Sequence, residues 1–235
     1  METMKLPTEK VKASRKSPKN MIIYGAPKIG KTTVLSKLDN CLIIDLESGS
    51  DMLDALKIKA NNLSELADVG RSIMKADKPY KYIAIDTISK LEEWCEAEGK
   101  KIYMKTPMGK NFETKNPGMS ILALPNGAGY LYLRMAYKKW IDRLNMLAEH
   151  VILVAHLKDK MLEKKGKEVA VKDLDLTGKI KQITCANADA VGFIFREGDQ
   201  TMISFNSLDD TVAGSRCDHL KGQTMPMNWS EIFID

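Results

Sequence analysis

The feature that most constrains this chain is the run Gly25-Ala26-Pro27-Lys28-Ile29-Gly30-Lys31-Thr32, which fits the P-loop pattern Gly-x-x-x-x-Gly-Lys-Thr. Its glycines let backbone N–H groups turn inward around an anion, and the following helix adds the positive end of its dipole. Lys31 then reaches the β- and γ-phosphates, while the Thr32 hydroxyl is a ligand for Mg²⁺. The sequence therefore predicts a site for a nucleoside triphosphate with Mg²⁺, made by these eight residues together with Thr33.

Short apolar runs along the first two thirds of the chain predict buried strands with helices between them. These runs are Met21–Tyr24, Cys41–Ile44, Tyr82–Ile85 and Val151–Ala155. Helices are expected over residues 31–38, from a cap at Asn62, after Asp86, over 130–148 and over 177–185. This alternation predicts an α/β fold with a mostly parallel sheet covered by helices on both faces. Two later runs, 190–196 and 201–206, predict antiparallel strands added at one edge.

Composition indicates one ordinary globular domain. The chain has 235 residues, of which 44% are hydrophobic and 29% are charged. No apolar stretch of about 18 residues occurs, so no membrane span is expected. The first twenty residues are polar and lysine-rich, which predicts a flexible basic arm (1–20) before a single domain (21–235).

Asp86 is the candidate for a second magnesium-binding group. It ends the third apolar run, and a P-loop site needs a carboxylate that holds the water shell of Mg²⁺. Alternatively, Asp86 caps the helix that follows, a task that the neighbouring Thr87 can also perform. The position at a strand end favours the magnesium role for Asp86.

Glu47 and His156 are candidates for catalysis. Glu47 follows the second predicted strand, so it emerges at the edge where the phosphates bind and can orient or deprotonate a water molecule. His156 follows the fourth strand at the same edge and can sense the γ-phosphate. In the alternative interpretations, Glu47 is a solvated loop residue and His156 is a hydrogen-bonded structural residue. Asp45, close to Glu47, can have a structural role.

Two segments between the predicted elements are further candidates for a functional role. Residues 104–129 show no periodicity, and a loop of this length is usually functional or disordered. Residues 159–173 are expected to form a hairpin that turns at Lys165-Gly166. The candidate DNA-binding residues in and beside it are Lys158, Lys160, Lys164, Lys165 and Lys167. A solvated hairpin with exposed lysines is the alternative, and the absence of aromatic residues from 157–176 weakens the DNA interpretation.

The order of these motifs resembles the core of the RecA-like recombinases. In that family, a strand with a catalytic glutamate follows the P-loop helix, and Cys41–Glu47 is similar to it. The Walker B strand comes next, and a later strand ends in a polar sensor, commonly glutamine, where this chain has His156. The resemblance is greatest to short phage RecA-like proteins, which include single-strand annealing recombinases.

This resemblance implies ATP as the nucleotide, single-stranded DNA as a partner and self-association as a ring or filament. It also implies that residues 104–129 and 157–176 are DNA-binding loops, and that basic residues reach a neighbour's nucleotide. The candidates for that contact in trans are Lys179, Lys181, Arg196 and Arg216. A single-strand-binding protein is a further candidate partner, and the expected location is the cytoplasm, that of the host cell for a phage protein.

The sequence leaves three functions open. The first is an Mg²⁺-dependent ATPase that acts on single-stranded DNA in recombination or strand annealing. The second is a small-molecule P-loop kinase, although a kinase lid needs clustered arginines and this chain has few. The third is a nucleotide-dependent switch that acts on a protein partner. We expect the first.

Overall fold

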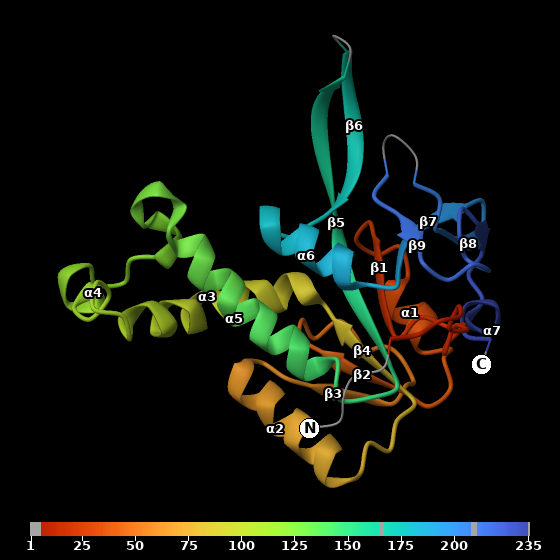
Figure 1. The fold of residues 1–235 in the computed structure, drawn as a ribbon, viewed down its shortest axis with the longest axis horizontal. Helices are drawn as coiled ribbons and strands as arrows, with labels where there is room; N and C mark the ends of the chain where they lie inside the picture. Colours follow the sequence, from red (N-terminus) through yellow and green to blue (C-terminus); the bar gives the residue numbers. More distant parts are fainter. Residues whose placement is uncertain (1–5, 165–166, 208–210, 235) are drawn as a thin grey trace.

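In the computed structural model, one mixed β-sheet runs through the molecule, with helices on both of its faces (Figure 1). The structure describes residues 6–164, 167–207 and 211–234, and for 160–164 and 167–170 it describes the backbone only. The strands are β1 (Asn20–Gly25), β2 (Cys41–Asp45), β3 (Lys57–Lys59), β4 (Tyr82–Asp86), β5 (His150–Lys164), β6 (Lys167–Leu174), β7 (Ala190–Glu197), β8 (Gln200–Ser204), β9 (Gly214–Ser215) and β10 (Thr224–Pro226).

The strand order across the sheet is β10-β8-β7-β1-β5-β4-β2-β3, with β6 beside β5 and β9 beside β7. The six strands from β7 to β3 are parallel to their neighbours on this path. Strands β8, β9 and β10, near one edge, pair antiparallel, and so does β6. The predicted α/β class is confirmed, with a mostly parallel sheet and antiparallel strands toward one edge. The expectation for 190–196 was wrong in one respect, because this run forms β7, which lies next to β1 inside the sheet and is parallel to it.

The α-helices are α1 (Lys31–Leu35), α2 (Leu63–Lys75), α3 (Ile88–Met104), α4 (Phe112–Lys115), α5 (Gly129–Leu144), α6 (Gly178–Asn187) and α7 (Trp229–Ile232), joined by two 3₁₀ turns, η1 (Ile121–Ala123) and η2 (Pro125–Gly127). Helices α2, α3, α5 and α6 pack on one face of the sheet. Helices α1 and α7 pack on the other face. The sheet is therefore covered on both sides, as the apolar runs predict.

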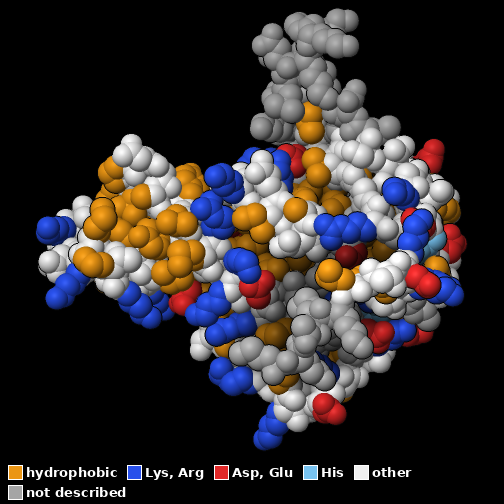
Figure 2. All heavy atoms as spheres, viewed as in Figure 1, with side chains coloured by type: hydrophobic (Ala, Val, Ile, Leu, Met, Phe, Trp, Pro, Cys, Tyr) orange, Lys and Arg blue, Asp and Glu red, His pale blue; other side chains and the backbone are white. Residues whose placement is uncertain are grey.

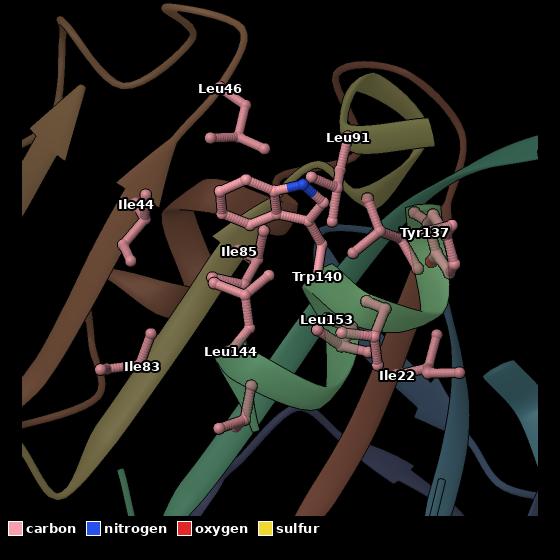
Figure 3. Close-up of a cluster of buried hydrophobic side chains, with 14 of the residues drawn as sticks. Ile22, Ile44, Leu46, Ile83, Ile85, Leu91, Tyr137, Trp140, Leu144 and Leu153 are labelled. Carbon is pink, nitrogen blue, oxygen red and sulfur yellow. The ribbon is translucent and has the colours of Figure 1, made fainter. Parts of the chain in front are cut away.

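Successive side chains of the central strands point to opposite faces of the sheet, and because both kinds of position hold apolar residues, both faces are apolar. In β1, Ile22 and Tyr24 belong to one core cluster, whereas Met21 and Ile23 belong to the other, and all four are fully buried. Figure 3 shows the first cluster, where the Trp140 ring of α5 lies among aliphatic side chains of the sheet and α3. Each such buried side chain contributes about 1.5–3 kcal/mol relative to exposure.

The predicted cap of α2 is confirmed. The Asn62 side chain accepts hydrogen bonds from the backbone N–H groups of Ser64 and Glu65, at 2.9 and 3.0 Å. Glu65 reaches back to the backbone N–H of Asn61 at 2.8 Å, one residue before the cap. These contacts satisfy N–H groups that have no partner within the helix.

The fourth predicted strand is longer than expected, because β5 continues past His156 to Lys164. Up to His156 it pairs in parallel with β1, and from Leu157 onward it pairs antiparallel with β6. The predicted hairpin is therefore confirmed by its pairing, and it projects from the sheet in Figure 1. Its predicted turn, Lys165-Gly166, lies outside the described residues.

Residues 104–129, expected to be a loop without periodicity, contain α4 and the two 3₁₀ turns. Tyr103, Phe112 and Ile121 form a small buried cluster of their own. The segment therefore closes the end of the antiparallel pair α3–α5. With the outer ends of these two helices it forms a helical lobe (residues 99–139) that extends from the body in Figure 1. Three core residues spread over nineteen positions leave no periodic signal in the sequence, which is why the lobe was missed.

The N-terminal segment joins the domain shortly before β1. The Ser17 hydroxyl accepts a hydrogen bond from the backbone N–H of Ile234 at 2.9 Å, and Asp189 accepts from the backbone N–H of Lys19 at 2.9 Å. Residues 6–16 precede these contacts and are exposed. No helix in the described parts of the chain has the length and apolar character that crossing a membrane requires.

Candidate active site

The register of the parallel strands brings the predicted site residues together. Gly25 at the end of β1 pairs with His156, and at the ends of β2 and β4 Asp45 pairs with Asp86. Strand β5 lies between β1 and β4. Because parallel strands end at the same edge, the loops after β1, β2 and β4 surround His156 there.

The structure explains why glycine occupies both Gly25 and Gly30 of the P-loop. A Cβ on Gly25 would lie 2.5 Å from the backbone oxygen of Ile194 on β7, which no side chain tolerates. Gly30, the residue before α1, has a φ of 98°, in the left-handed region that glycine adopts most easily. The tight turn into α1 therefore depends on glycine at these two positions.

Lys31 lies inside the loop that carries it. Its ammonium donates hydrogen bonds to the backbone oxygens of Gly25 and Ala26, both at 3.0 Å, and the residue is only 7% exposed. Burial lowers the pKa of Lys31, whereas the nearby carboxylates of Asp86 and Glu47 act in the opposite direction. The structure thus places a cation next to the anion-binding turn.

Thr32 and Asp86 form a direct pair. The Thr32 hydroxyl donates to the carboxylate of Asp86 at 2.7 Å. Burial raises the pKa of Asp86; the Thr32 hydrogen bond opposes this, and the carboxylates of Asp45 and Glu47 add to it. Thr87, the alternative cap, is the residue that accepts a hydrogen bond from Lys90 at the start of α3. Asp86 is therefore free of the capping role.

The Thr32–Asp86 pair fits a magnesium ion by its chemistry. A hydroxyl and a carboxylate are the hard oxygen donors that Mg²⁺ prefers, and Mg²⁺ usually takes only one or two protein groups beside phosphates and water. In the described part of the chain, no group of three or more His, Cys, Asp or Glu side chains could hold a metal alone. An ion completed by a triphosphate is consistent with both observations.

Asp45 organises the loop that carries Glu47. Its carboxylate accepts hydrogen bonds from the backbone N–H groups of Glu47 and Ser50, both at 2.9 Å, and from the Ser50 hydroxyl at 2.6 Å. Burial acts to raise the pKa of Asp45, but these hydrogen bonds outweigh it, so the pKa lies below its ordinary value. Asp45 is fully engaged as the structural residue of this turn.

Glu47 contacts two side chains at the same edge. Its Oε1 accepts a hydrogen bond from the Thr87 hydroxyl at 2.7 Å. The Nε2 of His156 lies 3.0 Å from both Oε1 and Oε2. A carboxylate can only accept hydrogen bonds, so Nε2 of His156 carries the hydrogen in this contact. Both side chains remain about one third exposed, so solvent reaches the pair.

The backbone of His156 is also held by neighbouring residues. Its backbone oxygen accepts from the N–H of Asp175 at 2.9 Å, and its backbone N–H lies 3.4 Å from the hydroxyl of Ser89. Ser89 in turn donates to the backbone oxygen of Asp175 at 3.0 Å. The ring nitrogen Nδ1 is buried, with no hydrogen-bond partner among the described residues. His156 thus connects the loop of Glu47 to the base of the β5–β6 hairpin.

A polar hollow of about 690 Å³ opens beside the P-loop, between α1 and the antiparallel edge of the sheet. Gly30 and Thr33 line it on one side, and Arg196 of β7 lines it on the other. Lys37, Gln200 and Asn228 contribute further polar side chains. Its size and position allow it to hold the part of a nucleotide beyond the phosphates.

The remaining predicted residues lie apart from this edge or outside the described side chains. Lys158 pairs with Asp175 at 3.2 Å at the base of the hairpin. The side chains of Lys160, Lys164 and Lys167 are not described, and Lys165 lies wholly outside the described residues. Lys181 pairs with Asp173, and Arg216 pairs with Asp189 at 3.8 Å. Lys179 is exposed at the start of α6.

Sequence reasoning missed two kinds of residue at this site. Thr87, which the sequence offers only as a helix cap, donates to Glu47, and Ser89 lies against the backbone N–H of His156. Their only signal is their place one and three residues after the strand-end Asp86. The C-terminal wall of the hollow, such as Asn228, comes from a segment with weak periodicity. No pattern in the sequence connects that segment to the P-loop.

Comparison with known proteins gives a family for this chain. A family model described as an AAA domain matches residues 17–217, which is most of the chain. No curated protein is similar enough to count as a match. Among solved structures, the crystal structure of the RadB recombinase is similar at 12% identity, with 92% of this chain and 90% of that chain covered and a TM-score of 0.47. A likeness this distant carries no argument about function.

Proposed function

This chain belongs to the family of AAA domains, and from that premise we propose that it binds ATP with Mg²⁺ at residues 25–33 and hydrolyses it. The observation that carries the proposal is the meeting of Lys31, the Thr32–Asp86 pair and Glu47 at one edge of the sheet. These groups supply a cation for the phosphates, oxygen ligands for a metal and a base for water. Together they are the parts that phosphoryl transfer to water requires.

Binding is assigned to the P-loop and the pair beside it. The backbone of residues 26–30 and the N-terminal end of α1 receive the phosphates, and Lys31 offers its ammonium to the outer ones. Thr32 and Asp86 are the groups that would hold Mg²⁺. When bound, the ion supplies charge neutralisation for the phosphate oxygens. The hollow lined by Thr33 and Arg196 takes the nucleoside.

Hydrolysis is assigned to Glu47. Its carboxylate orients a water molecule and accepts its proton, while the Thr87 hydroxyl and the His156 ring hold the carboxylate in place. Because His156 sits where β5 passes from the parallel sheet into the hairpin, its contact with Glu47 responds to the position of the hairpin. His156 is thus proposed as the sensor between the nucleotide and the hairpin.

We further propose that the chain acts on single-stranded DNA in phage-type recombination or strand annealing. Two observations support a polyanion partner. The hairpin carries Lys158, Lys160, Lys164, Lys165 and Lys167 along the chain. The helical lobe holds eight lysines and arginines and one glutamate, a net charge of +7, whereas the whole chain has +5. Figure 2 shows hydrophobic side chains on this lobe with lysines and arginines around them. Such a surface suits a phosphate backbone and unpaired bases.

Self-association as a ring or filament belongs to the same proposal, with a single-strand-binding protein as a further partner. Among the candidates for a contact in trans, Lys181 and Arg216 are held in ion pairs of their own chain, and Arg196 lines its own hollow. Lys179, exposed at the start of α6, has the freest access to a neighbour's nucleotide. The proposal also includes a cytoplasmic location and a basic arm at the N-terminus. The arm was predicted over residues 1–20, but Ser17 and Lys19 are bonded to the domain, so it can reach only to residue 16.

The test measures phosphate release with Mg²⁺-ATP in the presence and absence of single-stranded DNA, alongside a gel shift with and without the nucleotide. Stimulation of turnover by DNA and a nucleotide-dependent shift are the expected results. Phosphate transfer to a nucleoside monophosphate would identify a kinase instead. Slow turnover that DNA leaves unchanged would indicate a switch that acts on a protein partner.

A further inference from the structure

A second hollow, unrelated to the nucleotide site, lies between helices α2 and α5. It measures about 410 Å³, and none of its lining residues lines the hollow beside the P-loop. Its lining is Leu66, Ala67, Gly70, Arg71 and Met74 from α2, and Trp140, Arg143, Leu144, Met146 and Leu147 from α5 and the turn after it. Ala67 and Gly70 are small, so they leave the space between the two helices open at this point.

The lining of this hollow is apolar and buried in its centre and exposed at its rim. Leu66, Trp140 and Leu147 are buried and form its floor, whereas Met74 is 49% exposed and Met146 is 58% exposed. Methionine side chains are unbranched and polarisable, so they adapt to the shape of an apolar guest. A floor of this kind receives one or two large apolar side chains.

The charged residues that line the hollow are both arginines, although Asp68, beside the lining, forms an ion pair with one of them. Arg71 stands on the α2 wall and Arg143 on the α5 wall, and none of the lining residues is acidic. Asp68 forms an ion pair with one nitrogen of the Arg71 guanidinium. The guanidinium carbon of Arg143 lies 5.6 Å from the centre of the Trp140 ring. A guanidinium has five N–H donors, so both arginines keep donors for an incoming carboxylate.

We propose that this hollow docks an acidic peptide segment of a partner protein, with an apolar side chain in the hollow and carboxylates on Arg71 and Arg143. The two charges, one on each wall, select a segment with acidic residues on both sides of its apolar residue. The chain's own N-terminal segment carries Lys10, Lys12, Arg15, Lys16 and Lys19, so its charge opposes this surface. The inference does not depend on the activity proposed for the P-loop.

Nucleic acid suits this hollow less well than a peptide. Stacking of a base needs an accessible aromatic face, whereas Trp140 is 7% exposed and its ring packs into the core (Figure 3). Carboxylates match the planar fork of arginine in pairs of parallel hydrogen bonds. An apolar floor with two arginines at the rim therefore favours a peptide over nucleic acid as the occupant.

The test uses the intact chain and a fluorescein-labelled peptide, Asp-Asp-Glu-Gly-Phe-Gly-Glu-Asp-Asp, in fluorescence anisotropy. Saturable binding is expected, and replacing Phe by Ser or the acidic residues by Lys should weaken it at least tenfold. Arg71→Glu and Arg143→Glu should each weaken it at least fivefold. Arg134→Glu is the charge-matched control on α5, since Arg134 lines a different hollow, and it should change binding less than twofold.

Two substitutions of Gly70 separate filling of the hollow from loss of the fold. A Cβ at Gly70 meets Leu147 at 3.8 Å, an ordinary contact, so Gly70→Ala should fold and bind within threefold of the parent. Gly70→Leu fills the space and should weaken binding at least tenfold while circular dichroism stays unchanged. Three results would overturn the proposal: no saturable binding of the peptide up to millimolar concentration, equal losses in Arg134→Glu, or displacement of the peptide by single-stranded DNA. Self-association that Gly70→Leu abolishes would assign the hollow to a second copy of this chain and would also overturn it.

Discussion

Replacing Glu47 by Gln is the sharpest test of the proposed chemistry, because it removes a base and little else. Glutamine has the same shape, and its Oε1 can still accept the hydrogen bond that Thr87 donates at 2.7 Å. Toward His156, which lies 3.0 Å from both carboxylate oxygens, the amide offers one acceptor and one donor. The neutral imidazole can serve either group by its choice of tautomer, so the local arrangement should survive.

The expected loss follows from what a general base contributes. A positioned base accelerates a reaction by about 10²–10⁴-fold, so kcat should fall by that factor, which corresponds to roughly 3–5 kcal/mol in the barrier. Nucleotide affinity should change little, because Glu47 makes no contact with Lys31 or with the Thr32–Asp86 pair among the hydrogen bonds of the described residues. Steady-state phosphate release at saturating Mg²⁺-ATP measures kcat, and a fluorescent ATP analogue measures affinity.

Two outcomes would refute this reasoning. A kcat within about threefold of the parent would remove Glu47 from the chemical step and leave it as a loop residue. A parallel loss of affinity and turnover would show that the substitution disturbs the P-loop itself. Ser48→Ala, in the same loop and outside the hydrogen bonds of Asp45, is the matched control and should retain the parent's turnover.

Further predictions test the other parts of the site and fold. Lys31→Ala should lower ATP affinity by about 10–100-fold in a titration with a fluorescent analogue, since a hydrogen bond to a charged group is worth roughly 1.5–3 kcal/mol. Asp86→Asn should raise the unfolding midpoint of the nucleotide-free protein at pH 7 by about 2–4 °C, the effect of roughly 1 kcal/mol, while it abolishes stabilisation by Mg²⁺-ATP. The direction of this change follows from burial, which raises the pKa of Asp86 on folding. The stability contributed by the protonated carboxyl is therefore complete below pH 3.8 and is lost as the pH rises through the pKa of the folded protein. Gly129→Ala should destabilise the protein by about 1–3 kcal/mol in thermal unfolding, because the added Cβ would lie 1.9 Å from the backbone oxygen of Ile121.

Local patterns sufficed for the elements whose sequence reflects burial. The four parallel strands that end at the site are apolar on both faces, so a continuous run identifies each of them, and Asn62 with Glu65 identifies the start of α2. Strand β3 gives no such signal, because its residues Lys57–Lys59 lie on the sheet edge and are largely exposed. The short strands β9 and β10 are likewise defined by their partners rather than by their own residues.

The composition of the site was predictable, but its contacts were not. That Glu47, Asp86 and His156 share one edge follows from their positions at strand ends. That His156 touches Glu47 depends on β5 lying between β1 and β4, and strand order is a property of the crossovers. The same holds for Arg196, which reaches the hollow beside the P-loop only because β7 is the other neighbour of β1.

The position of β5 also bears on how DNA could change the rate of hydrolysis. The first strand of the hairpin, Leu157–Lys164, continues β5 directly after His156, and Asp175, just after the end of β6, donates its backbone N–H to the backbone oxygen of His156. Lys158 forms an ion pair with Asp175. A DNA phosphate that draws Lys158 away would therefore free the Asp175 side chain and weaken the hold of Asp175 on the backbone of His156. A shift of the histidine ring alters the hydrogen bond that His156 of β5 makes with Glu47. Any effect of DNA on turnover through the hairpin is therefore expected to depend on His156, whereas an effect through the helical lobe is not.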